Sequence, residues 1–64
     1  MRPDHSSTAT SYNNIGSVYY NKGDYENALV KYRKALEIRL KVLGPNHSDT
    51  ITSQTDVNNA LSMI

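Results

Sequence analysis

The feature that most constrains this chain is an internal repeat with a displacement of 42 positions. Four residues recur in the same order: His5, Thr8, Thr10 and Ser11 as His47, Thr50, Thr52 and Ser53. The interval between them holds two segments whose apolar side chains follow helical spacing. A period of this size, carried by a helical hairpin, is typical of arrays in which each unit packs on its neighbours. We therefore expect function on an exposed surface, and not in a buried catalytic pocket.

The 64 residues leave room for one small domain. A domain of this size buries only about 60% of the surface that its unfolded chain exposes, while ordering the backbone costs about 1–2 kcal/mol per residue. Disulfides, metals or neighbours usually supply the missing stability. Because the chain contains no cysteine, we expect neighbours, either flanking repeats of a longer chain or another copy in a homo-oligomer.

Charge and hydropathy argue against several classes of partner. Seven basic and six acidic residues nearly cancel, so no basic excess indicates nucleic acid. Residues 1–12 lack the apolar core of a secretion signal, and no apolar run approaches the roughly 20 residues of a membrane helix. We expect a soluble, cytoplasmic protein that binds neither nucleic acid nor membrane.

Apolar spacing predicts an all-α chain that starts with a polar loop over residues 1–7. The first helix covers 8–21, with Thr8 or a neighbouring serine as its cap and a stripe at i, i+3, i+4 and i+7. Gly23 closes this helix, and Asp24 caps a second helix that runs to Leu43. The connection of three residues makes the two helices antiparallel neighbours within the segment 8–43.

A third helix is predicted after Gly44 and Pro45, which end the second one. It follows a loop over 44–49, in which Ser48 and Asp49 serve as helix caps, and runs from about Thr50 to Ser62 within the segment 50–64. Its apolar side is formed by Val57, Ala60, Leu61 and Ile64. We interpret it as a cap, or as the first helix of a truncated repeat, because a polar outer face suits the end of an array.

A glycine in the middle of the first helix indicates that another backbone approaches closely. Such a glycine costs about 1 kcal/mol relative to alanine. We predict that Gly16 meets Ala28 where the helices cross, with large side chains filling the space around them. The predicted helix-packing residues are Tyr12, Ile15, Gly16, Tyr19, Ala28, Tyr32 and Ala35.

This pattern resembles the tetratricopeptide repeat, W-x-x-L-G-x-x-Y…A-x-x-x-F…A…P. Tyr12 stands at the tryptophan position, Ile15 at the leucine and Tyr32 at the phenylalanine, so each swap keeps a large apolar group. Leu40 replaces the family's proline, which lets the second helix continue to Leu43.

The length of 42 residues and four short strings are similar to the kinesin light chain subtype of this repeat. The strings are Asn13-Asn14-Ile15, Tyr25-x-x-Ala28, Ala35-Leu36-Glu37-Ile38-Arg39 and Leu43-Gly44-Pro45-x-His47. The resemblance covers about residues 4–53. Beyond Ser53 the register stays open, because Gln54 and Asn58 occupy the aromatic and glycine positions.

The resemblance implies a fragment of an α-solenoid that serves as a scaffold for protein–protein interaction. First helices of the family line a concave groove that holds a peptide or a partner helix. The implied groove residues are Thr10, Asn13, Asn14, Ser17, Tyr20 and Asn21, although Tyr20 can equally cover the junction between the first helix and the turn. Each asparagine carries two donors and an acceptor, enough to pair with a peptide backbone. The alternative is a purely structural unit, which self-associates or stacks on adjacent repeats and has no ligand of its own.

His5 and His47 are the candidates for a metal or catalytic site. Neither has a second ligand at i+3 or i+4, whereas zinc needs three or four convergent ligands. No serine joins a histidine and an aspartate in a plausible triad. The basic cluster of Lys31, Arg33 and Lys34 is interpreted as a solvated outer face. We expect no enzyme activity, no cofactor and no metal.

Overall fold

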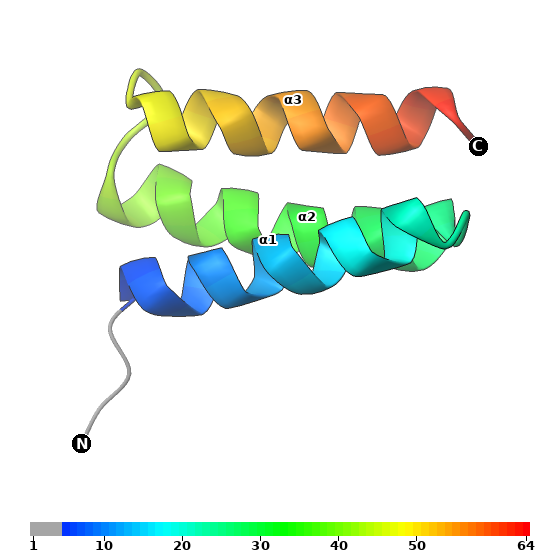
Figure 1. The fold of residues 1–64 in the computed structure, drawn as a ribbon. Helices are drawn as coiled ribbons and strands as arrows, with labels where there is room; N and C mark the ends of the chain where they lie inside the picture. The colour runs from blue at the N-terminus through cyan, green and yellow to red at the C-terminus, as the bar shows by residue number, and fades with distance from the viewer. Residues whose placement is uncertain (1–4) are drawn as a thin grey trace.

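The computed structural model describes residues 5–64, with side chains from Ser7 onward, and folds them into three helices (Figure 1). These are α1 (His5–Asn21), α2 (Tyr25–Val42) and α3 (Ser48–Ser62). Helix α2 packs against both α1 and α3. The architecture within this range is all-α, an antiparallel hairpin followed by a third helix. Its principal extents are 33 × 27 × 13 Å, so this part of the chain forms a flat slab with two broad sides.

The hairpin turn and the end of α2 follow local backbone rules, as the sequence predicts. Gly23 has a φ of 86° and closes α1, with the Asp24 N–H donating to the Tyr19 carbonyl at 2.9 Å. Asp24 caps α2, because its carboxylate accepts from the Asn27 N–H at 3.4 Å and from Asn27 Nδ2 at 2.7 Å. Helix α2 ends at Val42 with Leu43 as its C-cap, and Gly44 follows with a φ of 87°.

Two helix starts differ from the sequence prediction. Helix α1 begins at His5 and not at Thr8, so residues 5–7 of the expected loop are helical; residues 1–4 lie outside the described range. No glycine or proline occurs in this turn to interrupt it. Helix α3 begins at Ser48, and its cap is His47, whose Nδ1 accepts from the Asp49 N–H at 3.1 Å. The proposed capping role of Ser48 and Asp49 is wrong, because both already lie in the first turn.

The core is built mainly from small side chains. Ala9, Ala28, Ala35 and Ala60 are fully buried, and Tyr32 is the large aromatic residue buried among them. A Cβ atom placed on Gly16 would lie 2.7 Å from Tyr32 Cδ1 and 3.3 Å from the Ala28 carbonyl oxygen. Gly16 therefore lies directly against α2. Any larger residue at this position would force Tyr32 or the α2 backbone to shift.

A polar network joins α2 to α3. Arg39 is buried, and its Nη1 donates to Ser53 Oγ at 2.7 Å and to the Asp49 carbonyl at 3.1 Å. Thr50 Oγ1 donates to the Arg39 carbonyl at 3.3 Å. Next to this network, Ala28 and Tyr32 of α2 form an apolar cluster with Val57 and Ala60 of α3. The contact between α2 and α3 therefore has a polar part and an apolar part.

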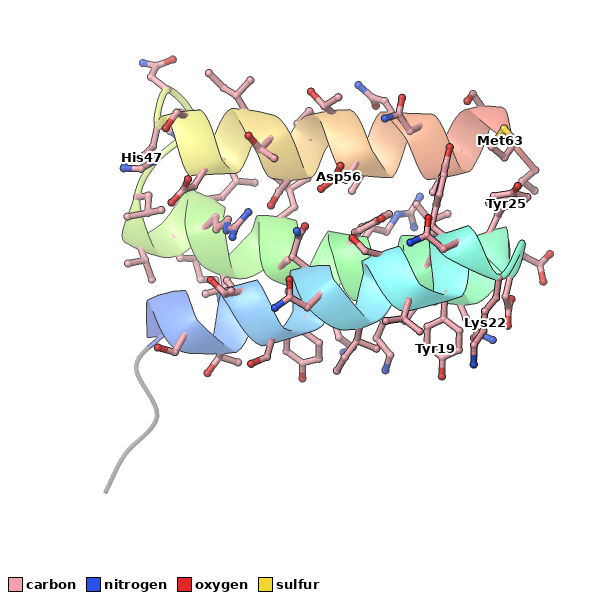
Figure 2. All side chains as sticks on the ribbon, in the orientation of Figure 1. Tyr19, Lys22, Tyr25, His47, Asp56 and Met63 are labelled. Carbon is pink, nitrogen blue, oxygen red and sulfur yellow. The ribbon has the colours of Figure 1, made fainter. Side chains whose placement is uncertain are left out.

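Asp56 projects from α3 toward the other two helices (Figure 2). Burial raises the pKa of its carboxyl above the usual 3.8, and the nearby charge of Arg39 opposes this shift only in part. A raised pKa means that the folded state binds the proton more tightly than the unfolded state. The free energy of unfolding therefore falls as the pH rises from about 4 through the folded pKa.

Asp56→Asn should raise the melting temperature at pH 7, because the ionised carboxylate is then no longer partly desolvated. Near pH 3 the carboxyl is largely protonated in both states, so the substitution should have little effect there. Thermal melts at both pH values test this, with Glu37→Gln on the exposed side of α2 as a charge-matched control. A lower melting temperature at pH 7, or equal shifts at both pH values, would contradict the assignment.

Candidate peptide-binding face

Helix α1 carries all six residues of the expected groove, and the structure divides them into two sets. Those that are exposed are Thr10, Asn14 and Asn21, and those that are half-buried are Asn13, Ser17 and Tyr20. The half-buried residues occupy positions i, i+4 and i+7, so they share one face of the helix. This face lies at the border between the α1–α2 contact and the exposed surface of α1.

Asn13 has an unusual environment for an amide. Its side chain is half-buried, and its Oδ1 atom is fully buried with no hydrogen-bond partner in the described part of the chain. A buried acceptor without a partner costs about 1–3 kcal/mol. The terminal torsion of asparagine is soft, so this amide can turn toward an N–H donor at little cost. Once its amide has turned to bring Oδ1 to the surface, Asn13 can accept a hydrogen bond from outside the chain.

Ser17 and Tyr20 already have partners within the hairpin. The hydroxyls of Ser17 and Tyr32 lie 3.2 Å apart and form a hydrogen bond between α1 and α2. The Tyr20 ring packs edge-on against Tyr25, with centroids 5.1 Å apart, and lies 6.4 Å from the Tyr32 ring. These residues hold the face in place, so Tyr20 covers the junction between helix and turn and remains half-buried.

The expected helix-packing residues fall into three groups by burial. Gly16, Ala28, Tyr32 and Ala35 are buried, whereas Tyr12 and Tyr19 are half-buried. Ile15 is exposed and lies outside the buried core. The ammonium groups of Lys31 and Lys34 lie 6.0 and 5.9 Å from the centre of the Tyr12 ring. These two lysines therefore contact an aromatic ring, which spacing along the sequence did not indicate.

Arg39 is buried, which was not predicted from the sequence. A signal was present, since Arg39 continues the stripe of Ala28, Tyr32 and Ala35 at helical spacing. A charged residue on that stripe is buried only where it finds partners, and the partners of Arg39 come from α3.

Among the residues that the structure describes, no cluster of three or more His, Cys, Asp or Glu side chains could hold a metal ion. His47 serves as a helix cap, and the His5 side chain lies outside the described set. Over the same range, no helix is both long and apolar enough to cross a membrane.

The family model described as Tetratricopeptide repeat matches residues 8–49. This match contains most of α1, all of α2 and the start of α3, and it has the length of the internal period. Comparison with curated proteins gives no match, and comparison with solved structures gives none either. The match covers more than half of the 64 residues. By this match, and by its helical hairpin with close packing at Gly16, the chain belongs to the tetratricopeptide repeat family.

Proposed function

We propose that this chain is a protein–protein interaction module, which holds an extended peptide or a partner helix against the polar face of α1. The tetratricopeptide repeat family generally mediates protein–protein interaction. The observation that carries the finer proposal is the buried, unpartnered Oδ1 of Asn13. An acceptor with this environment gains a hydrogen bond when a ligand presents an N–H group.

The chemistry of the face favours a peptide backbone as the ligand. Its residues are hydroxyls, amides and one tyrosine, without a charged side chain: Thr10, Asn13, Asn14, Ser17, Tyr20 and Asn21. Amides offer donors as well as acceptors, so they can pair with both polar groups of an extended chain. Tyr20, which is half-buried, adds an apolar contact at low entropic cost.

The kinesin light chain-like subtype and a cytoplasmic setting are part of this proposal. The matched segment has the length of the internal period, and α2 continues past Leu40 to Val42, as in a long second helix. The absence of cysteine is compatible with a reducing compartment.

Asn13→Ala should weaken peptide binding by about tenfold, the equivalent of one lost hydrogen bond. A display library of random, unstructured peptides would be selected on the wild-type chain, and the enriched peptides measured by fluorescence anisotropy. Asn46→Ala, an exposed asparagine in the loop before α3, is the matched control and should leave the affinity unchanged. The proposal fails if no peptide is enriched, or if both variants bind like the wild type while circular dichroism shows them folded.

A structural role in association between repeat units is a second candidate. It is favoured by exposed apolar side chains on the described helices, among them Ile15 and Val18 on α1 and Leu61 on α3. A small domain without disulfides gains stability when such surfaces are covered.

A further inference from the structure

The exposed side of α1 repeats the residues with which α3 docks on α2. Helix α3 buries two hydroxyl and two aliphatic residues, which are Thr50, Ser53, Val57 and Ala60. The residues 42 positions earlier are Thr8, Ser11, Ile15 and Val18. Each position keeps its chemical class. In α1, however, Ile15 is 44% exposed and Val18 is 54% exposed.

This repeated stripe lies on the side of α1 that faces away from α3. Tyr19 and Lys22 project from that side (Figure 2). Ile15 precedes Tyr19 by four positions and Val18 precedes Lys22 by four, so all of them share one face. The face with Asn13 and Ser17 is a different one, which leaves the stripe separate from the proposed peptide site.

The molecule itself contains the surface that fits such a stripe. On α2, the Arg39 guanidinium donates to the hydroxyl of Ser53, and the Ala28–Tyr32 cluster receives Val57. Ser11 offers the same hydroxyl and Ile15 a similar aliphatic group. We propose that the exposed face of α1 docks on α2 of a second copy of this chain, in the place of that copy's own α3.

Helix α3 then acts as an intramolecular competitor of this association. It is joined to α2 by the short connection over 43–47, and a short tether gives an effective concentration in the millimolar range. Ala60 is also smaller than Val18, so α3 fits the closely packed cluster with less strain. At micromolar concentration α3 should keep α2 covered, and the chain should stay monomeric.

Displacement of α3 would make the association open-ended. The contact joins α1 of one copy to α2 of the next, so it is heterologous and does not close on itself. Each added copy provides a further α2 surface for docking once its own α3 has dissociated from that surface. The docking of α3 would therefore decide whether the chain remains single or assembles head to tail.

The test uses the full chain with α3 undocked by Val57→Asp. In sedimentation equilibrium the wild type should keep its mass of 7.2 kDa at micromolar concentration, whereas Val57→Asp should rise with concentration to about twice that mass or more. Adding Ile15→Asp to the undocked chain should restore the monomer. Adding Val30→Asp, which changes an apolar residue of similar exposure on α2, should not.

A second measurement does not depend on how well the undocked variant folds. The wild-type chain at millimolar concentration should associate, because its copies then compete with the tethered α3, whereas Ile15→Asp should remain at 7.2 kDa. Equal masses for these two proteins would overturn the proposal, as would a helical Val57→Asp chain that stays monomeric. Assembly of Val57→Asp that persists after Ile15→Asp would also overturn it. Asn13→Ala should leave assembly unchanged, so this result and the peptide result are independent.

Discussion

Gly16→Leu is expected to remove most of the helical signal of the chain. Even a single carbon on Gly16 would lie 2.7 and 2.8 Å from two ring carbons of Tyr32, closer than such atoms pack. The ring cannot move aside, because Tyr32 is buried and hydrogen-bonded through its hydroxyl to Ser17. Leucine adds three further carbons at this point, so α1 must leave α2 and expose the small-residue core. Most of the stability of a helix in a protein comes from tertiary packing, so the loss of helicity should be visible by circular dichroism.

Smaller substitutions at Gly16 distinguish the steric effect on the melting temperature from the effect of helix propensity. Gly16→Ala gains about 1 kcal/mol of propensity but places a methyl group against the Tyr32 ring, so it should lower the melting temperature. In a Tyr32→Leu background the ring is absent, and the same change should become stabilising. Asn14→Leu, on the exposed side of α1, is the matched control. An unaltered melting curve for Gly16→Leu would show that the two helices are not in contact there.

The features that sequence predicts well here are those set by local backbone rules. Gly23 and Asp24 fix the turn between α1 and α2 through a positive φ angle and a side-chain cap. The replacement of proline by Leu40 lets α2 continue, because no local residue stops it. The starts of α1 and α3 were less predictable, since several polar residues could cap either helix. His47 does so for α3 with an imidazole nitrogen, a less common choice than serine or aspartate.

Side-chain environments depend on contacts between helices, so the candidate site was only partly predictable. The apolar stripe of α1 indicates where the helix is buried, but not how wide the buried arc is. Ile15 lies outside the buried arc and is exposed. Tyr20, expected either in the groove or over the junction between helix and turn, packs against Tyr25. The unpartnered Oδ1 of Asn13 depends on what α2 places next to it. Such a property does not follow from spacing along one helix.

Arg39→Met should release α3 while the hairpin of α1 and α2 stays folded. Methionine keeps most of the apolar stem but removes the donors that reach Ser53 Oγ and the Asp49 carbonyl. Hydrogen bonds to a charged group contribute about 1.5–3 kcal/mol, and buried acceptors left without a donor add to the loss. We expect the α2–α3 contact to weaken by about 2–3 kcal/mol. Amide hydrogen exchange should show reduced protection in α3 and little change in α1.

Two further variants identify the hydrogen bonds as the cause. Arg33→Met changes an exposed arginine of the same helix and should leave the exchange of α3 unaltered. Ser53→Ala in the Arg39→Met background removes the hydroxyl that has lost its hydrogen-bond donor. Part of the protection of α3 should then return, because replacing both partners of a hydrogen bond costs less than removing one. Equal loss of protection in all three helices would mean that α3 does not open separately. In that case the chain would unfold as one cooperative unit, and release of α3 alone could not expose the α2 surface.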